Sequence, residues 1–210
     1  MEMKLIDFLN RFKKTPAFSI REIEQLYPGF ERDNLLNWQK KGYILRIRNG
    51  WYSISGRITM EAELYWVANK IYRPSYVSLE KAFAYYHWIP EAVFTITSVS
   101  TLKTKVFDTP LGNFRYSSIK PSLFWGYQLI KVDEYGIKMA EPEKALLDFL
   151  YLNPNIQTFA DFESLRFNID QIREDVNQEK LTSYSNLFES ASLSKRVKTF
   201  IKYLDHVESL

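Results

Sequence analysis

Seven side chains in the first quarter of the chain have the chemistry that nucleic-acid recognition requires. An asparagine amide offers a donor beside an acceptor, which suits the edge of adenine, whereas arginine and lysine suit guanine edges and phosphates. All seven lie within residues 32–48, across a predicted helix and a predicted hairpin. We expect base contacts from Arg32, Asn34 and Asn37, phosphate contacts from Lys40 and Lys41, and backbone or minor-groove contacts from Arg46 and Arg48.

Two helices joined by a turn are predicted to position the first five of these side chains. Ser19 followed by Glu22 fits a capping box, in which side chain and backbone satisfy each other at a helix start. Pro28-Gly29 ends that helix and supplies the turn. A second helix is predicted over 31–41, with Gly42 at the position of a left-handed C-cap. This order predicts a helix-turn-helix.

The second helix is predicted to be two-sided. Successive residues of a helix are about 100° apart, so the core side and the outer side can be separated by position. We expect the core side to hold Leu35, Trp38 and Gln39. We expect the outer side to hold Asp33, Asn37, Lys40 and Lys41.

A hairpin follows at once. Asn49-Gly50 between alternating residues predicts a two-residue type I′ turn, because both central positions need positive φ. Pairing outward from that turn gives Arg48 with Trp51, Ile47 with Tyr52, Arg46 with Ser53 and Leu45 with Ile54. The predicted inner face is Leu45, Ile47, Tyr52 and Ile54, and the outer face is Arg46, Arg48, Trp51 and Ser53. Residues 1–58 therefore read as a winged helix-turn-helix DNA-binding domain; the alternative is a solvated hairpin used for protein contacts.

Composition narrows the class of protein. The chain has no cysteine and two histidines, so disulfides and thiolate metal sites are excluded, and we expect no metal or other cofactor. No apolar run approaches the roughly 20 residues that span a bilayer, and the N-terminus lacks a signal-peptide pattern, so we expect a cytoplasmic protein without membrane contact. Residues 1–58 carry 11 Lys/Arg against 6 Asp/Glu, whereas 59–210 carry 17 against 19. Positive charge is thus concentrated on the predicted DNA-binding domain.

The remainder, 59–210, is predicted to be a second domain. Thr59 is expected to cap a bridging helix within 59–74, and Ser78 a helix from Leu79. Four β-rich runs follow at 93–99, 104–108, 114–119 and 127–132, separated by turn signals. Helices are predicted over 141–152, 159–165, 178–190 and 194–207. The fold class is therefore α+β, with a mostly antiparallel sheet and flanking helices.

The second domain also contains residues that could indicate an enzyme. Asp133 with Glu141, Glu143 and Lys144 resembles the acidic set and lysine of a metal-dependent nuclease, which holds a metal that polarises water. However, Pro142 places the two glutamates at a helix start, where they complement the helix dipole. We expect no catalytic residues in this chain.

The middle of the chain contains four motifs in a fixed order. They are a Val-Ser-Leu-Glu helix with Ile-Pro-Glu after it, an Ile-Thr-x-Val strand, a Gly-x-Phe-x-Tyr strand and a Pro-Glu-Lys-Ala-Leu-Leu-Asp helix. They lie at Val77–Ala82 with Ile89-Pro90-Glu91, Ile96–Val99, Gly112–Tyr116 and Pro142–Asp148. With these motifs the chain resembles the AbiEi family of antitoxins and transcriptional regulators.

The resemblance implies a repressor that binds inverted repeats in its own operator. It also implies an antitoxin that opposes a nucleotidyltransferase-like toxin, with a winged helix in front of the domain that resembles the family. The alternative is a protein-interaction module that neutralises a partner directly, without sequence-specific DNA binding. In either case the sheet surface and the basic run Lys195–Lys202 are places where antitoxin action could lie, although a solvated helix face is the simpler interpretation of that run.

Overall fold

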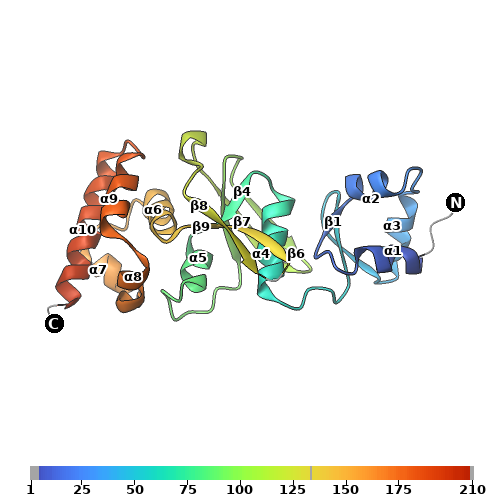
Figure 1. Cartoon of the computed structure of the whole chain (residues 1–210), viewed down its shortest axis with the longest axis horizontal. Coiled ribbons are helices and arrows are strands. Elements are labelled where there is room, and N and C mark those ends of the chain that lie inside the picture. Colours follow the sequence, from blue (N-terminus) through green and yellow to red (C-terminus); the bar gives the residue numbers. More distant parts are fainter. Residues whose placement is uncertain (1–4, 133, 209–210) are drawn as a thin grey trace.

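The computed structural model describes residues 5–132 and 134–208. The molecule is elongated, with its N-terminal elements at one end, a sheet in the middle and a group of helices at the C-terminal end (Figure 1). Among the described residues, no helix has the length and apolar character needed to cross a bilayer.

The first part, residues 5–58, is called the N-terminal unit below. Most of its buried apolar side chains form their own hydrophobic cluster, in which Phe8 contacts Phe18 and Trp38, whereas Ala17 and Ile47 pack into the core of the second part of the chain. A three-stranded antiparallel sheet, in the order β1-β3-β2, closes the unit. Its elements are α1 (Leu5–Phe12), β1 (Phe18–Ser19), α2 (Ile20–Leu26), α3 (Asp33–Lys40), β2 (Ile44–Arg48) and β3 (Trp51–Ile54).

Short sequence motifs account for the start of α2 and for the position of the hairpin turn. The capping box is present: Glu22 accepts hydrogen bonds from the Ser19 amide at 2.6 Å and from its hydroxyl at 2.8 Å. Gly50 has φ of +77°, but Asn49 does not have a positive φ, so the two-residue turn forms at the predicted place and is not the predicted type I′ turn. The helices and the hairpin therefore follow in the predicted order.

The second part, residues 59–208 without 133, is called the second unit. Its centre is a six-stranded sheet in the order β6-β7-β5-β4-β9-β8. The strands are β4 (Ser75–Val77), β5 (Ile96–Ser100), β6 (Lys105–Thr109), β7 (Gly112–Ser118), β8 (Tyr127–Val132) and β9 (Tyr135–Ala140).

The predicted α+β fold, with a mostly antiparallel sheet and flanking helices, is confirmed. Three of the five neighbouring strand pairs in the large sheet are antiparallel, and β5–β7 and β4–β9 are parallel. Strands β4 and β9 were not predicted. β4 is only three residues long and wholly buried, so it shows no alternation. β9 does alternate, with Tyr135, Ile137 and Met139 buried, and that period was a usable signal.

Helices cover both faces of this sheet. On one face, the Tyr116 hydroxyl of β7 donates to the Ala68 carbonyl of α4 (Glu61–Ile71). On the other, Thr97 of β5 accepts from the Lys81 amide of α5 (Glu80–Tyr85). Helix α6 (Pro142–Leu152) lies on that same side (Figure 1).

The remaining helices form the C-terminal end of the molecule (Figure 1). Long helix α10 packs against α6, α7, α8 and α9. Helix α8 (Ile169–Asp175) lies in the stretch 166–177, where no element was predicted. The elements are the 3-10 helix η1 (Pro121–Leu123), and helices α7 (Phe159–Ser164), α8 (Ile169–Asp175), α9 (Gln178–Asn186) and α10 (Ala191–Glu208).

Two predicted helix caps are wrong. Thr59 does not cap α4; instead its amide and that of Met60 donate to the carboxylate of Glu63. Ser78 does not cap α5, whose N-cap is Leu79 with φ of +63°. The Ser78 side chain is turned into the core, where a buried carboxylate accepts its hydrogen bond. A hydroxyl donates preferentially to a charged acceptor when one is within reach. The local sequence does not show that such an acceptor is present.

One guanidinium makes hydrogen bonds to both units. Arg57 donates to the Lys13 and Lys14 carbonyls after α1, to the Glu63 carboxylate in α4, and to the Tyr135 hydroxyl in β9 at 2.6 Å. Glu63 is only 1% exposed, so its charge depends on these donors. No such role for Arg57 was predicted from the sequence.

We expect Glu63→Gln to weaken this junction in a pH-dependent way. Burial raises the pKa of Glu63, but the Thr59 amide, Arg57 and the Met60 amide outweigh it, so the pKa lies below its ordinary value of 4.5. The ionised carboxylate therefore contributes stability above that ordinary value, and the contribution is lost as pH falls through the lowered pKa. Urea unfolding at about pH 7 should show the variant less stable by about 1–3 kcal/mol.

The difference should shrink as the titrations are repeated below the ordinary pKa of glutamate. Glu179, an exposed residue of α9, is the control, and its change to Gln should have little effect at any pH. A difference for Glu63→Gln that is the same at acidic and neutral pH would contradict the role given to the Glu63 charge.

Candidate nucleic-acid interface

Helix α3 is held in the N-terminal unit by its apolar side. Leu35 and Trp38 are buried, and the Trp38 ring lies 4.6 Å from that of Phe8. At the C-terminal end of the helix, the Tyr43 amide donates to the Trp38 carbonyl at 2.9 Å, and Gly42 between them has φ of +75°. The anchored side fixes which residues the helix presents outward.

The outward side contains most of the predicted residues. Asn37, Lys40 and Lys41 are all exposed. Gln39, which was predicted to face the core, is exposed as well, because Leu35 and Trp38 alone fill the contact with the core. Leu36 is 56% exposed beside them. Sequence reasoning missed both; the amide of Gln39 was a sufficient signal that it would stay in water.

The start of α3 is occupied differently. Arg32 is the N-cap position and makes no side-chain cap; its guanidinium pairs with Glu24 of α2 at 2.6 Å. The Arg32 side chain is still 66% exposed, and ion pairs in such positions are weak. Asn34 is half-buried. Of the two, Arg32 is therefore the more accessible to a ligand.

The hairpin has a different register from the predicted one. Arg48 pairs with Trp51 as expected, but the register then shifts between Arg46 and Arg48, as at a β-bulge. Arg46 therefore lies opposite Tyr52, and Ser53 becomes fully buried. The predicted faces are wrong in this respect: the inner residues are Ile44, Ile47, Tyr52 and Ser53. The Ser53 hydroxyl donates to the Pro16 carbonyl at 2.7 Å.

The two hairpin arginines have separate environments. Arg46 is exposed, with only a long 3.4 Å contact to Asn49. Arg48 is half-buried: its guanidinium donates to the Ile71 carbonyl at the end of α4 and lies 5.0 Å from the centre of the Phe107 ring. Arg48 thus attaches the hairpin to the second unit, which the sequence did not indicate.

Arg32 and Arg48 line one hollow, of about 680 Å³, beside the hairpin turn. Asn37, Lys40, Lys41 and Arg46 do not line it. The structure therefore places six of the seven predicted residues in two groups, one on the exposed face of α3 and the hairpin, and one in a recess next to them, whereas half-buried Asn34 belongs to neither.

The residues that could indicate a nuclease belong to the second unit and not to the unit that holds the seven predicted DNA-binding residues. Lys144 is fully buried and donates to Asp148 and to the Tyr76 hydroxyl. Glu143 accepts from the Asn177 amide and pairs with Lys180 at 2.9 Å. Asp133 falls outside the described residues. Within the described part of the chain, no cluster of three or more His, Cys, Asp or Glu residues is arranged to hold a metal ion.

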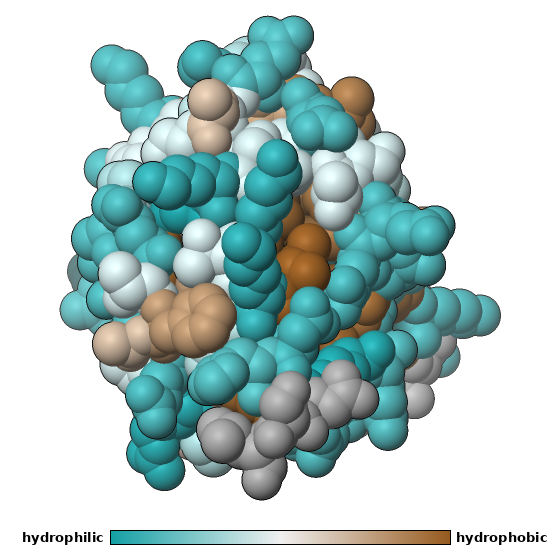
Figure 2. All heavy atoms as spheres, turned by 90° about the vertical axis from the view of Figure 1, so that its left-hand side faces the viewer, coloured by the Kyte–Doolittle hydropathy of each residue, from teal (hydrophilic) through white to brown (hydrophobic). Residues whose placement is uncertain are grey.

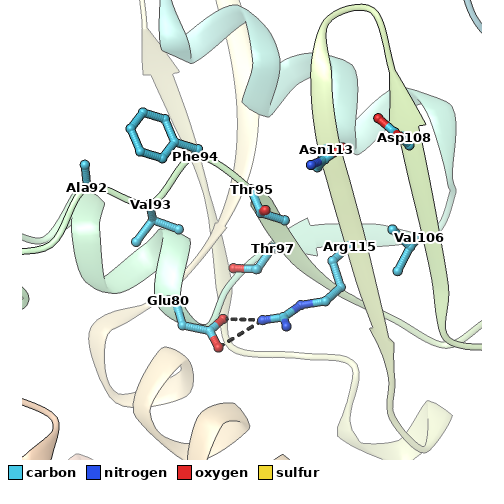
Figure 3. Close-up of a pocket in the computed structure, with 10 residues that line it drawn as sticks. All are labelled: Glu80, Ala92, Val93, Phe94, Thr95, Thr97, Val106, Asp108, Asn113 and Arg115. Carbon is cyan, nitrogen blue, oxygen red and sulfur yellow. Dashed lines mark hydrogen bonds and ion pairs between the residues drawn. The ribbon is translucent and has the colours of Figure 1, made fainter.

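A second hollow, of about 620 Å³, opens on the sheet face beside α5 (Figure 3). Glu80 of α5 and Arg115 of β7 pair across its floor at 2.9 Å. Phe94 lies at its rim and is 88% exposed, and Val106 of the edge strand β6 is 58% exposed. Phe94 and Val106 thus leave apolar surface uncovered beside an edge strand of the sheet.

The basic run of α10 divides into three exposed lysines and one buried arginine. Lys195, Lys198 and Lys202 are exposed, but Arg196 is buried and donates to the Pro154 carbonyl at 3.2 Å. The end of the molecule formed by the C-terminal helices is mainly hydrophilic, with apolar atoms visible in a recess (Figure 2). This supports a solvated helix face.

No protein-family model matches the chain, and no curated protein matches it. The resemblance to AbiEi proteins therefore stays a prediction.

We expect Asp148→Ala to destabilise the second unit strongly. Burial lowers the pKa of Lys144, and the carboxylate of Asp148 opposes that effect. Removing the carboxylate leaves a buried ammonium and the Tyr76 and Ser78 hydroxyls without their acceptor. Such a loss costs about 3–5 kcal/mol.

The measurement is the urea midpoint at neutral pH. The double change Lys144→Met with Asp148→Asn removes both charges and keeps an acceptor for the two hydroxyls, so it should cost less than Asp148→Ala alone. If the double variant is the less stable, the cost of the single variant does not come from an unpaired charge.

Proposed function

We propose that residues 5–58 form a winged helix-turn-helix that binds duplex DNA, with α3 in a major groove. The observation that carries the proposal is the exposed polar side of α3, whose opposite side is anchored by Leu35 and Trp38. A helix held in this way offers amides and cations to base edges and phosphates at a fixed orientation.

In this proposal Asn37 reads bases and Lys40 and Lys41 bind phosphates, as first expected. Gln39 joins Asn37 as a second amide on the exposed side, and the apolar side chain of Leu36 can contact a thymine methyl group. Arg46, at the exposed surface of the hairpin, is placed for backbone or minor-groove contact. Arg32 and Arg48 contribute from the adjacent hollow.

The charge distribution supports the same ligand. The N-terminal unit carries the positive excess, and its exposed cations require no rearrangement to meet a polyanion. Of the residues that suggested nuclease chemistry, Lys144 is held in a buried pair with Asp148 and Glu143 pairs with Lys180, and we propose a binding protein rather than an enzyme. With the AbiEi resemblance, the proposal becomes a cytoplasmic transcriptional repressor of its own operon and an antitoxin against a nucleotidyltransferase-like toxin.

The first test is binding to the DNA upstream of the gene, compared with a scrambled duplex, over several salt concentrations. A protein that neutralises several phosphates gives a negative slope of log affinity against log salt of several units. Selective binding with such a slope is the expected result. Equal, weak binding to both duplexes would show that the protein does not recognise a specific DNA sequence.

Asn37→Ala and Lys40→Ala should separate base reading from phosphate binding. Asn37→Ala is expected to lose about 1–3 kcal/mol of preference for the upstream DNA over the scrambled duplex. Lys40→Ala should weaken both duplexes alike and reduce the salt slope by about 1. Lys198→Ala, on exposed α10 at the other end of the molecule, is the control and should change neither.

If Asn37→Ala weakens both duplexes equally while the selectivity stays, the helix binds without reading bases. Binding that is unchanged in both Asn37→Ala and Lys40→Ala would remove α3 from the interface.

A second candidate function is favoured by the exposure of Phe94. In this alternative the second unit neutralises a protein partner through the hollow beside α5, without sequence-specific DNA binding. We then expect Phe94→Ser to abolish co-purification with the product of the neighbouring gene while the fold and the DNA affinity are retained. Leu129→Ser, a change of another exposed apolar residue on the opposite edge strand, is the control. Co-purification that survives Phe94→Ser would exclude this hollow.

A further inference from the structure

The hollow beside the hairpin turn is lined by both units. Its walls include four arginines, two glutamates, the turn residues Asn49 and Gly50, and Trp51. Three of the arginines, Arg21, Arg32 and Arg48, belong to the N-terminal unit, whereas Arg73 follows α4 in the second unit. This recess is called the arginine hollow below.

The two glutamates of the hollow already have partners within the chain. Glu22 accepts the two hydrogen bonds of the Ser19 capping box, and Glu24 pairs with Arg32. Among the residues that the structure describes, no carboxylate lies within ion-pair distance of Arg21 or Arg73, and both are exposed. The hollow is therefore cationic, with two guanidiniums free to bind an anion.

The attachment of the hairpin explains why Arg73 reaches this place. Arg48 donates to the Ile71 carbonyl, two residues before Arg73, so the turn end of the hairpin and the end of α4 are held together. Lys70 shows the resulting concentration of charge: burial lowers its pKa and the neighbouring Arg73 lowers it further, while Glu22 acts in the opposite direction. Arg73 also borders a smaller recess with Lys70 and Lys138, so the cationic surface continues onto the second unit.

We propose that the arginine hollow binds a phosphate of the DNA backbone and that Arg73 of the second unit contacts that phosphate. This inference rests on the proposed function and deepens it. The DNA-binding surface then extends beyond the winged helix, and the second unit contributes directly to affinity. Arg21 holds the same phosphate from α2, because it lines the hollow from the other unit.

A backbone phosphate fits the hollow for chemical reasons. Planar guanidiniums bind phosphate oxygens through paired N–H donors, and the hollow presents several from different elements. The hollow is lined by the hairpin turn and by Arg32 at the start of α3, the helix that is proposed to meet the duplex. A free phosphate or pyrophosphate has the same chemistry, so the experiment must separate the two sources.

The experiment measures anisotropy of a labelled duplex over a series of salt concentrations, using the full chain. Arg73→Ala is expected to weaken binding to the upstream and scrambled duplexes alike and to lower the salt slope by about 0.9, the value for one lost phosphate contact. Arg21→Ala should act similarly. The double variant should lose no more than about one contact if both residues hold the same phosphate. Arg73→Lys should recover part of the slope, and Lys198→Ala should leave it unchanged.

Thermal unfolding of each variant confirms that it is folded; because both arginines are exposed, we expect no change. A folded Arg73→Ala variant with wild-type affinity and slope overturns the inference, and if Lys40→Ala still lowers the slope, the proposed function stands. A wild-type protein that binds no duplex overturns both. Calorimetric titration with inorganic phosphate and pyrophosphate is the last arm: tight binding that is lost in Arg73→Ala, with duplex binding unchanged, assigns the hollow to a free phosphoryl ligand instead.

Discussion

The arrangement of the whole molecule depends on the guanidinium of Arg57. It satisfies the carbonyls of Lys13 and Lys14, the Tyr135 hydroxyl and the nearly inaccessible carboxylate of Glu63. A buried carboxylate without such a partner is strongly unfavourable, so the end of α1, the start of α4 and strand β9 must meet at this point. The orientation of α3 relative to the sheet follows from that constraint, because α3 is packed on α1 through Phe8 and Trp38. Arg48 adds a second attachment at Ile71.

Some charged groups of this protein are buried and paired, whereas others are exposed to solvent. In the interior of the second unit, Lys144 and Asp148 are enclosed together with hydroxyls that complete their hydrogen bonds. A buried charge is tolerated only when it is paired in this way. By contrast, Lys40 on α3 and Arg73 in the arginine hollow are exposed, and among the described residues neither has a carboxylate within ion-pair distance. Groups that are unpaired yet orientated by a rigid element remain available to a ligand, and this contrast separates the proposed interface from the supporting structure.

Sequence reasoning succeeded where a structural feature depends on a few neighbouring residues. The Ser19–Glu22 capping box, the turn at Asn49-Gly50 and the start of α6 at Pro142 are each determined by local backbone chemistry. It failed where the competing partner is distant in sequence. Ser78 was given to its own helix, but the carboxylate of Asp148 lies 70 residues away and binds its hydroxyl. The alternation assumed for β2 failed for a similar reason, because Ile44 and Ile47 are both drawn into cores and the strand must shift its register between Arg46 and Arg48.

By itself, the sequence determined the α+β class, the order of helices and hairpin in the N-terminal unit, and the outward placement of Asn37, Lys40 and Lys41. These follow from periodicity and turn chemistry, which act over a few residues. Only the tertiary structure decided that Arg48 is bound to the second unit and that Arg73 shares a hollow with Arg21. Such placements depend on how the surfaces of the two units meet. The partners of these charged side chains are distant in sequence and become neighbours only in the tertiary structure.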